Sequence, residues 1–110
     1  MRNAWVLLVE DDEAMGRLTS ASLTRAGFTV TFLRTGAAAL ELLGVEAIDV
    51  VLTDLNMPGM SGLELCRRVT EARPDVPVLV ITAFGTMETA LDAMRAGAYD
   101  FVTRPLQPEA

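Results

Sequence analysis

The stretch IDVVLTDLNMPGMSG, residues 48–62, sets the pattern on which the whole chain is built. It opens with a near-continuous apolar run, residues 48–53, which is typical of a strand covered on both faces of a sheet. This run ends at Asp54. Ser61, with Glu64 three positions later, matches a capping box and predicts the start of a helix. The stretch therefore predicts a strand that ends in an acid and is followed by a helix.

The same alternation continues on both sides of this stretch. Further short runs rich in Val, Leu and Ile occupy residues 5–9, 28–33, 78–82 and 100–103. The run 28–33 alternates apolar and polar residues, which predicts an edge strand, whereas most of the others are nearly continuously apolar, which favours strands buried on both faces.

Longer stretches with helical spacing separate these runs. The residues that mark them are Met15, Leu18, Ser22 and Leu23 before Gly27; Thr35, Gly36, Leu40 and Leu43 before Gly44; Leu65 and Val69 before Pro74; and Thr86, Met87, Ala90, Leu91 and Met94 before Gly97. The chain thus alternates strand and helix and ends on a fifth strand. This order predicts one α/β domain with a parallel sheet, right-handed crossovers and helices on both faces.

Composition excludes several classes of function. The net charge is −6, and all nine basic residues are arginine, so direct binding of this domain to nucleic acid is not expected. The chain contains no histidine, which excludes histidine catalysis and histidine-ligated zinc. Its single cysteine, Cys66, has no partner for an internal disulfide. The longest apolar run, residues 4–9, is too short to span a membrane, and a cytoplasmic location is expected.

Charged and polar residues stand where the predicted strands end. These residues are Glu10, Asp11 and Asp12 after the first strand, Asp54 after the third, Thr82 at the end of the fourth and Arg104 after the fifth. Ligand sites in such sheets lie beyond the carboxyl ends of the strands. The carboxylates of Asp11, Asp12 and Asp54 would repel one another there, and Mg²⁺ would relieve that repulsion. Each acid taken singly, Asp12 above all, is also explained as a helix N-cap or a solvated loop residue.

Thr82 and Arg104 extend this acidic site. A hydroxyl group can hydrogen-bond a phosphoryl oxygen, and a cation can neutralise its charge. Together with the acids they describe an anion-plus-magnesium site around a carboxylate nucleophile.

Four motifs in this order closely resemble those of receiver domains of response regulators in two-component signalling, the CheY-like superfamily. They are VEDD at 9–12, TDLNMPGMSG at 53–62, ITAFG at 81–85 and GAYDFVTRP at 97–105. The resemblance covers essentially the whole chain. It implies a flavodoxin-like doubly wound sheet of five parallel strands in the order 2-1-3-4-5, with residues 1–110 as one receiver domain.

The resemblance also implies a role for each matching residue. Asp54 resembles the phosphoacceptor, which a sensor histidine kinase would phosphorylate in a Mg²⁺-dependent reaction. Asp12 and Asp54 would ligate Mg²⁺ directly, Asp11 through water, and Asn56 through its backbone carbonyl. Thr82 and Phe101 match the residues that switch the output face, and Arg104 takes the place of the basic residue. The domain would be a regulatory phosphoacceptor that assists its own phosphorylation and dephosphorylation, and not an enzyme.

Residues 83–90 look most like receivers of the nitrogen-regulatory (NtrC-like) type. Such receivers usually precede an AAA+ ATPase domain and a DNA-binding domain, so regulation of transcription through an output domain outside this chain is expected. On this interpretation Met87, Leu91 and Met94 are candidates for an apolar patch that faces a partner. Packing in the core explains the same three residues equally well.

The chain departs from the family at two places. The family's basic residue is nearly always lysine, whereas this chain has Arg104, a bulkier and forked cation. The chain ends at residues 106–110, where the family begins a fifth helix. We therefore expect the domain to stop short of that helix, with apolar surface uncovered near the first and fifth strands and a homodimer as one way to bury it.

Two other functions remain open at this point. A magnesium-dependent phosphatase of the haloacid-dehalogenase type also uses an Asp at a strand end, but it needs a second acid where this chain has Asn56. A receiver-like interaction module that is no longer phosphorylated would retain the fold without the chemistry. Arg104 and the early end of the chain favour such a module, while Asp11, Asp12, Asp54 and Thr82 favour phosphorylation.

Overall fold

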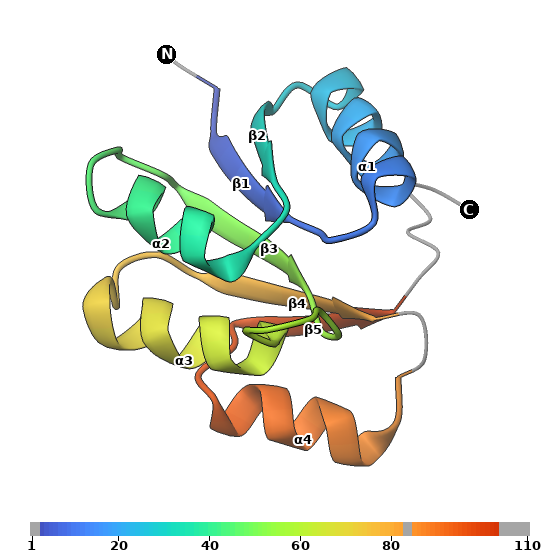
Figure 1. Cartoon of the computed structure of the whole chain (residues 1–110), viewed down its shortest axis with the longest axis vertical. Helices are drawn as coiled ribbons and strands as arrows, with labels where there is room; N and C mark the ends of the chain where they lie inside the picture. Colours follow the sequence, from blue (N-terminus) through green and yellow to red (C-terminus); the bar gives the residue numbers. More distant parts are fainter. Residues whose placement is uncertain (1–2, 83–84, 104–110) are drawn as a thin grey trace.

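The computed structural model describes residues 3–82 and 85–103, and in these residues strands and helices alternate along the chain (Figure 1). The strands are β1 (Trp5–Val9), β2 (Thr29–Leu33), β3 (Val50–Asp54), β4 (Val78–Thr82) and β5 (Asp100–Thr103). The helices are α1 (Glu13–Arg25), α2 (Gly36–Leu43), α3 (Gly62–Ala72) and α4 (Met87–Arg95). Each strand is as predicted to within two residues at either end.

The five strands form one parallel sheet in the order β2-β1-β3-β4-β5. This confirms the predicted strand order and the place of β2 at an edge. The register brings Val9 of β1 beside Thr53 of β3, and Asp54 beside Ile81 of β4. The residues that follow Val9 therefore leave the sheet next to Asp54, at its carboxyl edge.

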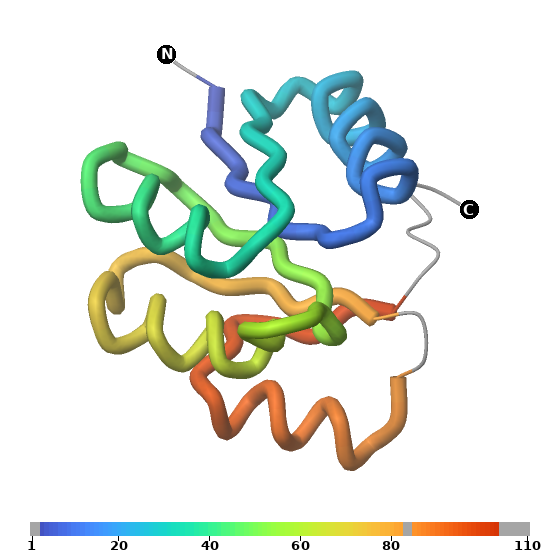
Figure 2. Tube along the Cα trace, in the orientation of Figure 1, coloured from blue at the N-terminus to red at the C-terminus, as the bar shows by residue number. Residues whose placement is uncertain are grey.

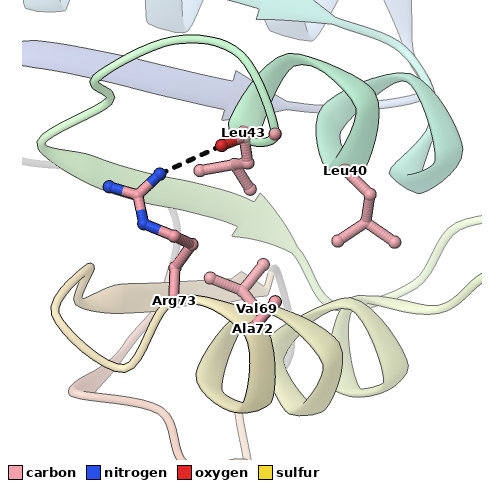
Figure 3. A pocket seen from close by; sticks show the side chains of 6 residues that line it. Leu40, Leu43, Val69, Ala72 and Arg73 are labelled. Carbon is pink, nitrogen blue, oxygen red and sulfur yellow. Dashed lines mark hydrogen bonds between the residues drawn. The ribbon is translucent and has the colours of Figure 1, made fainter.

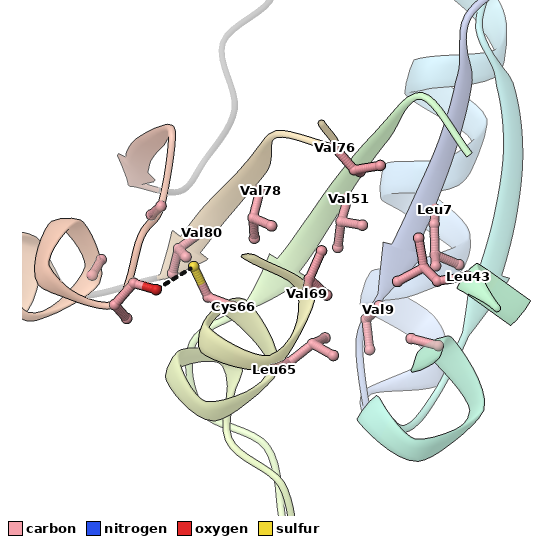
Figure 4. Packing of buried hydrophobic residues seen from close by; sticks show 14 of the residues in the cluster. Leu7, Val9, Leu43, Val51, Leu65, Cys66, Val69, Val76, Val78 and Val80 are labelled. Atoms are coloured by element: carbon pink, nitrogen blue, oxygen red, sulfur yellow. Dashed lines mark hydrogen bonds between the residues drawn. The ribbon is translucent and has the colours of Figure 1, made fainter. Parts of the chain in front are cut away.

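Helices cover both faces of the sheet, with α2, α3 and α4 on one face and α1 on the other (Figure 1). Side chains alternate between the two faces along each strand, so Leu7 belongs to one hydrophobic cluster and Leu8 to the other. The larger cluster joins strand residues such as Val51 and Val80 to Val69 of α3 (Figure 4). Burial on both faces explains why the three inner strands, β1, β3 and β4, are apolar at nearly every position.

The side chain of the preceding residue caps each helix. These caps are Asp12, Thr35, Ser61 and Thr86, and each accepts a hydrogen bond from a backbone N–H in the first turn. The capping box expected at Ser61 is only half formed, because Ser61 Oγ accepts from Glu64 N while the Glu64 carboxylate binds Arg67 and Arg68. A complete box is present at Thr86 and Thr89.

The inner face of α1 differs from the one expected from its sequence. Leu18 was expected to share one face of this helix with Met15, Ser22 and Leu23, but it is 65% exposed, and the buried residues of the helix are Gly16 and Thr19. A Cβ atom added at Gly16 would overlap the ring of Phe32 in β2. The glycine thus lets the helix lie close to the sheet at this point, and the buried stripe is centred there and not on Leu18.

No helix within the described residues is both long enough and apolar enough to cross a membrane. Residues 3–82 and 85–103 hold four helices. The region where a fifth helix would begin, residues 104–110, lies outside the described residues, as does Arg104.

Candidate functional site

Three carboxylates meet at the carboxyl edge of the sheet. One oxygen from each of Glu10, Asp11 and Asp54 lies within 4.8 Å of the others. Glu10 and Asp11 follow β1 directly, and Asp54 ends the neighbouring strand β3, so the two chain segments leave the sheet side by side (Figure 2). Carboxylate oxygens at this spacing form a donor set that suits a hard divalent cation.

Glu10 is a member of this cluster that the sequence analysis did not name as a metal ligand. It is only 3% exposed, and its N–H donates to Leu33 O at 3.0 Å, which extends the β1–β2 pairing by one residue. Its Oε2 accepts from Asp12 N at 3.2 Å. Glutamate is seldom buried so deeply without a structural or functional partner. Its position directly after the buried run 5–9 is the signal that sequence reasoning could have used.

Asp12 has another role in the structure than the direct metal ligand that was predicted. Its Oδ1 accepts a hydrogen bond from Met15 N at 3.0 Å, and it caps the N-terminus of α1. Asp12 is exposed and lies outside the group formed by Glu10, Asp11 and Asp54. The N-cap interpretation that the sequence left open for Asp12 is therefore the one that the structure favours.

Asn56 lies in the loop between β3 and α3, two residues beyond Asp54, and it is exposed. Two backbone hydrogen bonds hold the ends of this loop: Leu55 N donates to Ile81 O at 2.8 Å, and Gly62 N donates to Leu55 O at 2.9 Å. The loop is thereby tied to β4 on one side and to the start of α3 on the other. Asn56 thus lies close in sequence to the cluster, on a loop that is fixed at both ends.

Thr82 and Phe101 lie on the same face of the sheet. Phe101 is the β5 partner of Val80, and Thr82 is two residues beyond Val80, so the alternation of side chains places Thr82 on the face of Phe101. Thr82 is almost fully buried. The Phe101 ring contacts the larger cluster, and its Cε2 would lie 3.1 Å from a Cβ atom at Gly85, in the segment before α4.

Two arginines flank the acidic cluster on its α1 side. Arg17 donates to Glu13 Oε2 from Nε at 3.0 Å and from Nη2 at 2.7 Å. These hydrogen bonds and the charges of Arg17 and Arg34 lower the pKa of the Glu13 carboxyl. The negative charge of Glu13 is therefore paired with two exposed arginines, Arg17 and Arg34.

A pocket of about 220 Å³ lies between α2 and α3, away from the acidic cluster. Its lining residues are Leu40, Leu43, Gly44, Val69, Ala72 and Arg73 (Figure 3). Arg73 Nη1 donates to Leu43 O at 3.0 Å across the seam between the helices. Because these residues end α2 and α3, the pocket is at the opposite edge of the sheet from Asp54. The candidate functional site is therefore the acidic edge of the sheet and not this pocket.

Comparison with known proteins relates residues 6–110 to the family described as the response regulator receiver domain. The response regulator protein FleR of Pseudomonas aeruginosa is 40% identical over 107 residues, which cover 97% of this chain and 23% of FleR. The DNA-binding transcriptional regulator NtrC of Escherichia coli is 35% identical over 105 residues, 96% of this chain and 22% of NtrC. The chain thus spans about a quarter of the length of these curated relatives.

Solved structures with the same fold agree with this result. The crystal structure of FixJ-N superposes with a TM-score of 0.88 at 36% identity and covers 97% of this chain and 86% of that one. A response regulator from Burkholderia pseudomallei with a phosphorylated aspartic acid, a calcium ion and citrate has a TM-score of 0.87 at 28% identity, over 96% of this chain and 62% of that one. The similarity to NtrC agrees with the subtype expected from residues 83–90.

Proposed function

Because the chain belongs to the response regulator receiver domain family, we propose that it works in a phosphorelay in which Asp54 accepts the phosphoryl group. The observation that carries this proposal is the cluster of Glu10, Asp11 and Asp54 at the carboxyl edge of the sheet. Asp54 is the member that ends β3, the strand between β1 and β4. The phosphorylated aspartic acid in the Burkholderia pseudomallei relative is consistent with such chemistry.

The carboxylates fit a bound Mg²⁺ ion. The oxygens of Glu10, Asp11 and Asp54 lie within 4.8 Å of one another, and oxygen ligands of this kind are those that Mg²⁺ prefers. Asn56 would add its backbone carbonyl, as the family implies. The chemistry that a bound Mg²⁺ ion supplies is positive charge that offsets the charge of the transferred phosphoryl group. We assign Asp12 to the N-terminus of α1 and Glu10 to the metal site.

In the transfer step, a carboxylate oxygen of Asp54 forms a bond to phosphorus while the phosphorus–nitrogen bond of a phosphohistidine donor breaks. The electron pair of that bond returns to the donor imidazole, and the product is an acyl phosphate on Asp54. Thr82 supplies a hydroxyl group for a phosphoryl oxygen, and Arg104 supplies the cation. The chain thereby assists its own phosphorylation as a regulatory domain and not as an enzyme.

Phosphorylation then changes the conformation of Thr82, Phe101 and α4. Thr82 and Phe101 share one face of the sheet, and Phe101 lies against Gly85 just before α4. A shift of Thr82 toward the phosphoryl group would free space into which the Phe101 ring can turn. Met87 is 78% exposed, and Leu91 and Met94 are also exposed. Their exposure favours the partner-facing interpretation over packing in the core.

The partners follow from this function. The donor is a sensor histidine kinase, and the receiver of the signal is an output domain outside residues 1–110, of the AAA+ and DNA-binding kind expected for NtrC-like proteins. FleR and NtrC are both regulators about four times as long as the matched segment. We propose a cytoplasmic location, one receiver domain over residues 1–110, and a homodimer as a further assembly.

Incubation with acetyl phosphate and Mg²⁺, followed by mass measurement of the intact protein, tests this function. We expect one labile phosphoryl adduct on the wild type and none on Asp54→Asn. Absence of an adduct despite measurable Mg²⁺ binding would contradict the proposal and favour an interaction module. Sustained hydrolysis of unrelated phosphate esters would instead indicate a phosphatase.

A further inference from the structure

The turn at residues 34–36, which ends with the first residue of α2, contacts two loops at the acidic site. One is the loop after β1, which carries Glu10 and Asp11, and the other is the loop that follows Asp54 at the end of β3. Arg34 reaches the loop that joins β1 to α1, and Gly36 lies against the loop that joins β3 to α3. The turn itself contributes no carboxylate to the cluster. Its contacts therefore bear on how the acids are held and not on which acids take part.

Arg34 holds the main chain of Asp11 with a forked contact. Its Nε donates to Asp11 O at 3.1 Å and its Nη2 donates to the same oxygen at 2.6 Å, while Nη1 lies 3.4 Å from Glu13 Oε1. Parallel pairing of Val9 with Leu33 brings the two strand ends together. Donors with fixed mutual geometry restrain the direction of a carbonyl group. A restrained peptide plane at Asp11 also restrains the direction of its Cα–Cβ bond, from which the side chain extends.

Gly36 holds the second loop by steric contact. A Cβ atom added at Gly36 would lie 2.8 Å from Met60 Sδ and 3.3 Å from Met60 Cβ and Cγ. The Met60 side chain therefore lies directly on the main chain at Gly36. Met60 also contacts the larger hydrophobic cluster, so the loop after Asp54 is packed between α2 and the core.

We propose that the 34–36 turn is a positioning element of the acidic site. It holds the two loops so that the oxygens of Glu10, Asp11 and Asp54 stay within 4.8 Å of one another, although their charges repel. The proposal rests on the function given above, because this spacing matters when Mg²⁺ binds and Asp54 is phosphorylated. Partners that orient metal ligands in this way commonly change the affinity for the metal. Arg34 acts through the main-chain carbonyl group of Asp11 and not through its carboxylate.

Whether Arg34→Ala binds Mg²⁺ more weakly or more tightly than the wild type distinguishes a positioning role of Arg34 from a purely electrostatic one. The guanidinium of Arg34 is a positive charge near the cluster and opposes the binding of a divalent cation. If charge were its whole contribution, Arg34→Ala would bind Mg²⁺ more tightly than the wild type. If Arg34 positions Asp11, the same substitution weakens binding. Arg17→Ala is the matched control, because it removes an arginine from the same Glu13 without touching the Asp11 contact.

Calorimetric titration of the whole chain with MgCl₂ measures this difference. We expect Arg34→Ala to weaken binding about tenfold, at the lower end of the range for residues that orient metal ligands. Arg34→Lys, which keeps the charge but loses the fork, should be intermediate. Arg17→Ala should stay within about twofold of the wild type, since exposed ion pairs contribute little. Unchanged or tighter binding by Arg34→Ala overturns the assignment of Arg34.

A second pair of variants tests the contact at Gly36. Gly36→Ala should weaken Mg²⁺ binding because the added methyl group displaces Met60 and its loop, and Met60→Ala should also weaken it because it removes the side chain that packs against Gly36. Gly44→Ala is the matched control, because it adds a methyl group at an exposed glycine whose nearest neighbours are 3.4 Å or more away, and it should leave binding unchanged. Wild-type affinity in either Gly36→Ala or Met60→Ala overturns this half of the proposal.

Hydrogen exchange in metal-free buffer separates this proposal from the proposed function. The backbone amides of residues 11–13 should exchange faster in Arg34→Ala than in the wild type and in Arg17→Ala, whether or not Mg²⁺ binds. If the wild type itself binds no Mg²⁺, the proposed function fails and the exchange rates alone decide whether the turn holds the loop. Equal exchange rates in all three proteins overturn the proposal.

Discussion

Gly62, the first residue of α3, lies directly against the main-chain carbonyl group of Asp54 at the end of β3. A Cβ atom at position 62 would overlap the Asp54 carbonyl oxygen and come within 2.9 Å of its carbonyl carbon and of Leu55 Cα. These are backbone atoms at the end of β3 and in the residue that follows it, and they cannot move aside as a side chain can. The close approach of α3 to the proposed phosphoacceptor therefore depends on a glycine at this position.

We accordingly expect Gly62→Ala to destabilise the domain by about 1–3 kcal/mol, the usual cost of forcing extra atoms into a packed site. Urea denaturation followed by circular dichroism measures this loss. Gly44→Ala is the matched control, because its nearest neighbours would be 3.4 Å or more from the new Cβ atom and Gly44 is exposed. A loss of stability at Gly62 no greater than at Gly44 would show that the contact is not restrictive.

Asp12 gives a second prediction, because its carboxylate caps α1 and lies outside the acidic cluster. Asp12→Ala should cost about 1 kcal/mol of stability, as the loss of an N-cap usually does. Asp12→Ser retains a capping oxygen and should recover most of that stability with Mg²⁺ binding preserved. Glu10→Gln and Asp11→Asn should instead weaken Mg²⁺ binding. A complete loss of Mg²⁺ affinity in Asp12→Ser would return Asp12 to the metal site.

Cys66 gives a prediction about reactivity. Burial raises the pKa of its thiol, and the Sγ atom lies 3.6 Å from Ala96 O, at the contact between α3 and the end of α4 (Figure 4). A raised pKa lowers the fraction of thiolate, which is the reactive form. We therefore expect iodoacetamide at pH 8 to alkylate the folded protein much more slowly than the protein in urea. Equal rates in the two conditions would show that Cys66 is accessible.

Mg²⁺ should also stabilise the folded domain, because the folded state brings three carboxylates together and the unfolded chain does not. At a Mg²⁺ concentration a hundred times the dissociation constant, the gain is about 2.7 kcal/mol. Thermal melts in MgCl₂ and in EDTA measure this gain, with Asp54→Asn as the variant that should show a smaller one. A melting temperature that does not respond to millimolar Mg²⁺ would count against the metal site.

The sequence allowed the sheet and two of the three clustered carboxylates, those of Asp11 and Asp54, to be predicted, since both follow from patterns within short segments. The run 48–53 identifies β3, and Asp54 follows it directly. The roles of Asp12 and Glu10 could not be distinguished in this way, because three consecutive acids do not show where the strand ends and where the helix begins. A shift of one residue in the position where β1 ends determines which acid joins the cluster and which one caps the helix.

The inner face of α1 depends in the same way on a contact that is distant in sequence. Leu18 is the more apolar residue, but Gly16 meets Phe32 of β2 and fixes which side of the helix faces the sheet. The contact between Arg34 and Asp11 likewise joins residues 23 positions apart. Such pairings arise from the register of β1 and β2 and are not visible in either segment alone.

Chemical mapping of the phosphorylated residue decides whether Asp54 is the phosphoacceptor. Borohydride reduces an aspartyl phosphate to homoserine, and cleavage after Arg34 and Arg67 yields residues 35–67 as one peptide that is separate from residues 3–17 with Glu10 and Asp11. After treatment with acetyl phosphate and Mg²⁺, tandem mass spectrometry should find homoserine at position 54. Reduction at Asp11, Asp12 or Asp49 instead, or equal labelling of Asp54→Asn, would show that Asp54 is not the phosphoacceptor.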